Sequence, residues 1–317
     1  MTRSTDQSRR DAKRLKKSHA SGTAEAVTRV RAVLGDVPAL RHADALHVIA
    51  REAGHDSWPK LKFALEMAAM DRAARVRRLE TALYFGQHWV SRALLDADPG
   101  LGDAHVGLLA ALHREDALAA TLAAEPALAT HAVGLGNRRP LLHLAFSKWH
   151  QAPGGDAARS VGIADLLLRH GADANDSYAY QGDPTMPLSA LYGALGHGDN
   201  LPLAEWLLTH GADPNDNESL YHSTELGHRD GLRLLLAHGA RPQGTNALLR
   251  ALDFNDHEAV SLLLDAGADP NEGVAPHPSG EPPFVIPALH QAARRMCDGR
   301  MISLLLEAGG DPSARYQ

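Results

Sequence analysis

The most regular feature of the chain is a run of two or three leucines that is closed by a glycine and followed by a polar turn. It occurs five times, as LLLRHGADAN (166–175), LLTHGADPN (207–215), LLLAHGARPQ (234–243), LLLDAGADPN (262–271) and LLLEAGGDPS (304–313). The leucines predict the end of an amphipathic helix, and the glycine predicts a left-handed residue that closes it without a Cβ clash. Asp-Pro or Asp-Ala then turns the chain, because Asp bonds to its own backbone and Pro cannot continue a helix.

A second, shorter helix is predicted upstream of several copies. Examples are 140–145 (PLLHLA), 186–191 (MPLSAL) and 286–292 (IPALHQA), and short turns such as 226–228 (LGH) separate the paired helices. Repeated helix pairs are typical of a solenoid, in which each pair buries its apolar side against its neighbours. The short first helix, the Gly-His turn and the Leu-Leu-Leu-x-x-Gly-Ala-Asp-x-Asn ending together resemble the ankyrin repeat.

This resemblance implies an all-α fold, an ankyrin-repeat solenoid of about seven units. Looser copies at 82–98 and 106–126 extend the pattern toward the N-terminus, so we assign the solenoid to residues 71–317. The closing glycines lie 40, 28, 28 and 42 residues apart. The short spacings predict clipped finger loops before Gly239 and Gly267. The long ones predict enlarged fingers at 175–185 and 271–286, and a further insertion lies at 149–160.

The N-terminal part has a different pattern. Residues 1–10 are polar and are expected to form a disordered basic tail, and residues 11–70 are expected to form a small helical module. Gly54 ends one predicted helix, and Ser57 caps the next with Trp58 and Pro59 at its first positions. The spacing of Ala45-Leu46, Ala50-Arg51, Gly54, Ser57-Trp58 and Leu61-Lys62 resembles the module that precedes ankyrin repeats in bacterial proteins. That resemblance implies a bacterial origin and no known activity.

Charge is unevenly distributed along the chain. The net charge is −6, but residues 1–31 hold nine Lys or Arg against three Asp or Glu, a net of +6, which leaves −6 − 6 = −12 for the remainder. A basic arm on an acidic body can bind nucleic acid or anionic lipid. We interpret it as a solvated helix because no nucleic-acid recognition motif accompanies it, and nucleic acid is not an expected partner.

Candidate chemistry is sparse. Most of the nineteen histidines fall at repeat positions, and His42, His47 and His55 do not share one helical face, so no metal site is expected. The single cysteine, Cys297, lies near Arg294 and Arg295, without a catalytic partner pattern. We therefore expect no enzyme, no catalytic residue and no cofactor. The alternative is an enzyme or small-ligand-binding protein with a pocket in the ankyrin groove or the N-terminal module.

The leading hypothesis is a protein–protein interaction module that binds a partner protein or peptide on the concave face and finger tips of the solenoid. Aromatic residues and Arg anchor many interfaces, and only 5% of this chain is aromatic. The candidate contact residues are Ser147, Lys148, Tyr178, Tyr180, Tyr221, Glu225, Asp253, Phe254, Phe284, Arg294 and Arg295.

No apolar run is long enough to span a membrane, and the opening residues lack the apolar core of a secretory signal. We expect a cytoplasmic monomer with no membrane partner.

Overall fold

The computed structural model describes residues 4–272 and 286–314 of the chain, which divide into two compact bodies, Met1–Arg78 and Leu79–Gln317. The division falls eight residues after the boundary that the sequence suggested, which was between residues 70 and 71. It lies within α5 (Arg72–Tyr84), which is one continuous helix. We call the two parts the N-terminal body and the repeat body.

The N-terminal body contains α1 (Thr5–Ala20), α2 (Ala24–Leu34), α3 (His42–Glu52) and α4 (Trp58–Ala68). Its core includes Leu15, Val30 and Ile49. Residues 5–10, expected as a disordered tail, lie in α1. The Ser4 side chain accepts a hydrogen bond from the Gln7 amide at 3.1 Å, and Ser8, Ala12 and Leu15 form the buried side of that helix. A capped N-terminus and a buried stripe explain why the helix starts so early.

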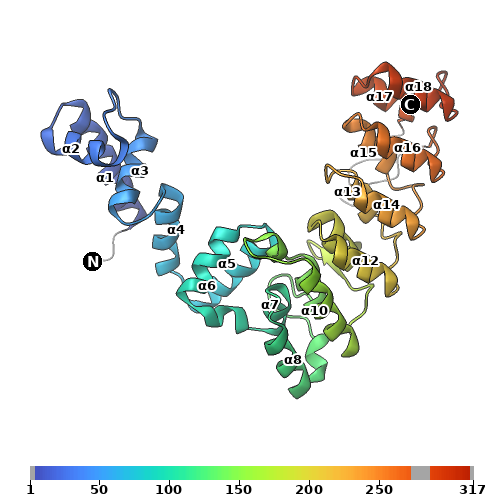
Figure 1. Cartoon of the computed structure of the whole chain (residues 1–317), viewed down its shortest axis with the longest axis horizontal. Helices are drawn as coiled ribbons and strands as arrows, with labels where there is room; N and C mark the ends of the chain where they lie inside the picture. Colours follow the sequence, from blue (N-terminus) through green and yellow to red (C-terminus); the bar gives the residue numbers. More distant parts are fainter. Residues whose placement is uncertain (1–3, 273–285, 315–317) are drawn as a thin grey trace. The chain divides into compact units, whose positions relative to one another are not determined.

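The repeat body is a series of helix pairs (Figure 1). After α6 (His88–Ala97) and η1 (Pro99–Asp103), the paired helices are α7 (Val106–Ala111) and α8 (Glu115–Ala124), α9 (Pro140–Ala145) and α10 (Ala158–Arg169), α11 (Ala190–Tyr192) with η4 (Gly193–His197) and α12 (Leu201–Thr209), α13 (Ser219–Ser223) and α14 (Asp230–Ala237), α15 (Ala247–Asp253) and α16 (His257–Asp265), and α17 (Ala288–Arg294) and α18 (Gly299–Glu307). Two short helices, η2 (Pro126–Ala129) and η3 (Trp149–Gln151), lie in the connections. The first helices of successive pairs contact one another. The predicted helical solenoid is thus confirmed.

The closing phrase of each repeat does what its sequence predicts. Its glycines all adopt left-handed φ angles, +94°, +92°, +86°, +91° and +91° at Gly171, Gly211, Gly239, Gly267 and Gly309. The asparagine at the end of the phrase adds a connection between repeats. Asn175 donates from Nδ2 to the Gly211 carbonyl at 2.8 Å and accepts from the Asp213 amide at 2.8 Å. Asn271 makes the same two contacts with Gly309 and Asp311.

The enlarged finger at 175–185 is a β-hairpin. Its strands, β1 (Ser177–Tyr180) and β2 (Asp183–Ser189), pair antiparallel with Tyr178 opposite Leu188, and the register shifts between Ala179 and Tyr180. The insertion at 149–160 contains η3 and the start of α10. Most of the second enlarged finger, 271–286, lies outside the described residues.

Candidate functional site

The first helices of the C-terminal pairs turn charged and aromatic side chains away from the core. In α15 the buried residues are Ala247, Leu248, Ala251 and Leu252. Arg250 and Asp253 lie three residues apart on the remaining side and are partly exposed, and Phe254, which follows the helix, is 51% exposed. This periodicity leaves one side of a short helix free for polar side chains. We call the outward side of α13, α15 and α17 the first-helix face.

Arg250 connects two helix pairs on this face. Its Nε donates to Glu225 Oε1 on the preceding pair at 2.7 Å, and its Nη1 donates to Asp253 Oδ2 at 2.9 Å. The guanidinium also lies 4.8 Å from the Phe254 ring centre and 5.8 Å from that of Tyr221. A cation between two aromatic rings and two carboxylates forms a planar, charged surface that a partner can stack on.

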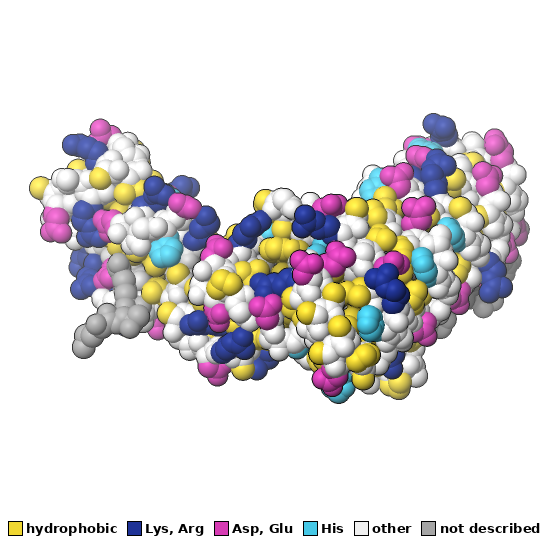
Figure 2. All heavy atoms as spheres, turned by 60° about the horizontal axis from the view of Figure 1, so that its bottom comes forward, with side chains coloured by type: hydrophobic (Ala, Val, Ile, Leu, Met, Phe, Trp, Pro, Cys, Tyr) yellow, Lys and Arg dark blue, Asp and Glu magenta, His cyan; other side chains and the backbone are white. Residues whose placement is uncertain are grey.

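Asp253 continues the connection to the next pair. Its Oδ1 accepts from Arg295 Nε at 2.7 Å and also from the Gln291 side-chain amide. Cations and carboxylates therefore alternate across three pairs, and we call His222, Glu225, Arg250, Asp253 and Arg295 the C-terminal ladder. On the face that Figure 2 shows, Lys and Arg side chains likewise lie among Asp and Glu over the C-terminal pairs.

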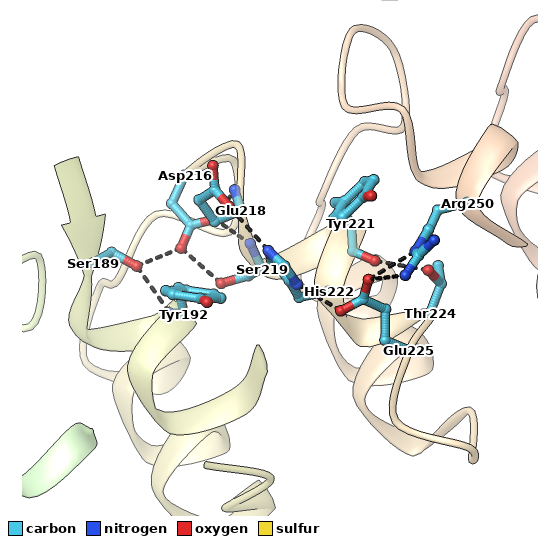
Figure 3. Close-up of polar contacts among 10 residues, drawn as sticks. All are labelled: Ser189, Tyr192, Asp216, Glu218, Ser219, Tyr221, His222, Thr224, Glu225 and Arg250. Carbon is cyan, nitrogen blue, oxygen red and sulfur yellow. Dashed lines mark hydrogen bonds and ion pairs between the residues drawn. The ribbon is translucent and has the colours of Figure 1, made fainter. Parts of the chain in front are cut away.

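His222 begins the ladder between two carboxylates (Figure 3). Its Nε2 lies 3.2 Å from Glu218 Oε2 and its Nδ1 lies 2.7 Å from Glu225 Oε2. Burial opposes the charged imidazolium, but the hydrogen bonds to Glu218 and Glu225 outweigh it and raise the pKa of His222. Both ring nitrogens can donate only when the ring is protonated, so this geometry favours the imidazolium.

Five of the expected contact residues come together here. Tyr221, Glu225, Asp253, Phe254 and Arg295 belong to the connected surface around Arg250. Arg294 is exposed on α17 beside it. Sequence reasoning missed His222 and Arg250, although a signal was present. His222 and Arg250 are 28 residues apart, as are Glu225 and Asp253, which is the spacing of the repeat itself.

The other expected contact residues lie elsewhere. Ser147 is buried, and its hydroxyl donates to the Ala111 carbonyl at 2.7 Å, so its assignment as a partner contact is corrected to a packing role. Lys148 is partly buried, and burial lowers its pKa. The Arg138 guanidinium lies over the Tyr178 ring, 4.0 Å from the ring centre, whereas Tyr180 is 39% exposed on the hairpin. Phe284 lies outside the described residues.

Within 4–272 and 286–314, no group of three or more His, Cys, Asp or Glu side chains is arranged to hold a metal ion. The helices in the same ranges include none with the length and apolar character needed to cross a bilayer. The hollow beside Phe254, lined by Asp256, His257 and Arg300 among others, opens to solvent.

Comparison with known proteins identifies ankyrin repeats in part of the chain. A family model described as ankyrin repeats (3 copies) matches residues 191–273. The crystal structure of the human ASB11 ankyrin repeat domain is 21% identical, with a TM-score of 0.47, and the match covers 67% of this chain and 86% of that one. The ankyrin repeat domain of Bcl-3, a member of the IkappaB protein family, is 18% identical, with a TM-score of 0.48 and coverages of 68% and 90%. No curated protein sequence matches the chain.

Proposed function

This chain is an ankyrin repeat protein, and from that premise we propose that it binds a partner protein or peptide through the first-helix face of α13, α15 and α17. Ankyrin repeats are generally protein–protein interaction modules. The observation that supports this face is the arrangement of Arg250 between Tyr221 and Phe254, because exposed aromatic and arginine side chains anchor many interfaces.

The ladder also indicates what kind of partner fits. Its positive and negative side chains already pair with one another across three helix pairs. A uniform polyanion would meet Glu225 and Asp253 as like charges, which costs binding energy. A peptide strand or protein surface with both signs of charge and an apolar side chain over Phe254 suits the face better.

The proposal extends to the rest of the chain. The N-terminal body is a separate helical module, and the protein acts as a cytoplasmic monomer. Having only one cysteine, Cys297, is compatible with a reducing compartment, where proteins do not depend on disulfides.

The test compares what the immobilised full chain captures from a lysate of its native cells. Phe254→Ala combined with Arg294→Ala should abolish capture of a protein that the wild type retains, with far-UV circular dichroism and melting temperature unchanged. The matched control, Arg169→Ala with Leu306→Ala, removes an exposed arginine and an exposed apolar side chain from second helices. It should capture as the wild type does.

A different outcome would place the binding site on the N-terminal body. If the Phe254 and Arg294 variant still captures the protein, while Lys13→Glu with Lys16→Glu on α1 does not, the basic helix of the N-terminal body is the binding element.

A further inference from the structure

The first helices α7 and α9 are covered, unlike those of the C-terminal pairs. All six residues of each helix are buried, whereas α13, α15 and α17 each keep partly or fully exposed residues on their outward side. The cover is the C-terminal end of α5. Glu80, Leu83 and Tyr84 line one hollow with Leu108 of α7 and His143 of α9. We call this outward side of α7 and α9 the covered face.

The backbone of α5 is held at its end by groups from two later pairs. The Leu83 carbonyl accepts from the Lys148 amide at 2.9 Å, and the Tyr84 carbonyl accepts from His197 Nε2 at 2.8 Å. Carbonyls at a helix C-terminus lack partners within the helix and carry its partial negative charge. The Lys148 amide, which follows α9, and the His197 ring, at the last residue of η4, therefore bind the C-terminus of α5. Regular stacking of neighbouring pairs does not explain these two contacts.

The side chain of Glu80 is bound as a ligand carboxylate would be. It is almost fully buried, and its Oε1 accepts from the Leu135 amide, at the tip of the finger before α9, at 2.8 Å. His105 Nε2 lies 3.1 Å from the same oxygen. Because His105 Nδ1 accepts from the Leu108 amide, Nε2 carries the proton of the ring and faces the Glu80 carboxylate. A buried carboxylate is costly without such donors, so its position is specific.

The Tyr84 ring fits between aromatic and cationic groups. It stacks on Phe146, with ring centres 5.8 Å apart and planes within 3° of parallel, and lies 4.2 Å from the His197 ring. The Arg138 guanidinium lies 5.0 Å from its centre. Arg138 beside Tyr84 and Tyr178 repeats the arrangement of Arg250 beside Tyr221 and Phe254 on the open part of the solenoid.

We propose that the covered face is a helix-binding site, which the end of α5 occupies in cis. In trans it accepts a partner helix that carries a carboxylate, an aliphatic and an aromatic side chain at positions i, i+3 and i+4. Glu80, Leu83 and Tyr84 have that spacing and so share one side of α5. This site lies on α7 and α9, away from the C-terminal ladder, and the proposal goes beyond the function proposed above. Its occupant in cis is the end of α5, so release of α5 would open a second peptide site.

The test uses a fluorescein-labelled peptide of residues 72–86 as the trans ligand and measures its fluorescence anisotropy with the full chain. Glu80→Ala with Tyr84→Ala weakens the cis helix but leaves the covered face intact. This variant should bind the peptide at least tenfold more tightly than the wild type. Phe85→Ala is the matched control, since Phe85 is 62% exposed next to Tyr84, and it should bind as the wild type does.

Two further measurements keep the test decisive. A peptide with the same two alanines should not bind the double variant; equal binding of both peptides would overturn the proposal. If the double variant does not fold, Glu80→Gln replaces it, because Gln retains the size and an acceptor for the Leu135 amide. A folded Glu80→Gln chain should bind the peptide more tightly than the wild type. No gain in either folded variant would show that α5 is a permanent part of the core.

Discussion

Arg250 on α15 reaches back one helix pair to Glu225, which follows α13, and donates to its carboxylate at 2.7 Å. Glu225 also receives His222, and Arg250 also binds Asp253, which receives Arg295 from the next pair. Arg250 and Asp253 thus connect the charges of three successive pairs into one surface.

Removing the Arg250 side chain should lower the free energy of unfolding slightly and abolish most of the partner binding. In Arg250→Ala we expect the free energy of unfolding to fall by about 1 kcal/mol, because the ion pairs are only partly buried. Urea denaturation of the full chain measures this. We expect the same variant to lose capture of the partner.

A matched arginine separates the two effects. Arg233 on α14 pairs with Glu258 on α16, also across one repeat, but both side chains are more than half exposed. Arg233→Ala should change stability by less than about 0.5 kcal/mol and leave capture intact. Loss of capture in both variants would mean that general charge, and not the first-helix face, is recognised.

The asparagines that end the repeat phrase should stabilise the stacking of pairs. Asn175→Ala removes one hydrogen bond to the Gly211 carbonyl and one from the Asp213 amide, so we expect a loss of about 1–2 kcal/mol in urea denaturation. Asn175→Asp keeps the acceptor and loses only the donor, and should lie between Asn175→Ala and the wild type. Equal stability of all three proteins would contradict a role for this asparagine between repeats.

His222 should make the repeat body less stable at alkaline pH. Its pKa is raised in the folded chain, with Glu218, Glu225 and the Tyr192 ring around it. Its contribution is therefore fully present below the unfolded pKa of about 6.5 and is lost as pH rises through the higher folded value. We expect the free energy of unfolding of the wild type to decrease more steeply above pH 6.5 than that of His222→Gln. Parallel curves would show that His222 is not protonated in the fold.

Other histidines should have the opposite effect. Burial is the main cause that lowers the pKa of His113, His143 and His197 to about 4 each, so the fold holds them neutral. Their contribution is present above pH 6.5 and is lost as pH falls from there toward 4. We expect chemical denaturation to show a loss on the order of 1 kcal/mol per histidine at pH 5. His197→Gln can still donate to the Tyr84 carbonyl and should show a smaller acid-induced loss than the wild type.

The sequence predicted what depends on local chemistry. The closing glycines follow from backbone preferences near each residue, and the structure agrees at Gly171. The short helix expected at 186–191 was wrong, because β2 continues to Ser189 and α11 begins only at Ala190. The start of α1 was missed because Ser4 was not recognised as a cap. The position of Ser147 was missed because its partner, the Ala111 carbonyl, is 36 residues away.

The largest difference concerns α5. The sequence pattern begins a loose repeat at residue 82, but the structure has one helix, Arg72–Tyr84, across that position, and its end covers α7 and α9. That placement depends on Leu135, Lys148 and His197, which lie far along the chain from Glu80 and Tyr84. Periodicity within a repeat carries no information about such contacts.

Hydrogen exchange of the full chain, with and without the captured partner, tests the central claim most directly. We predict that the partner slows amide exchange in peptides from α13, α15 and α17, where Tyr221, Arg250 and Arg294 lie, and leaves peptides from α1 unchanged. Slowed exchange confined to α1, with the three first helices unaffected, would contradict the account.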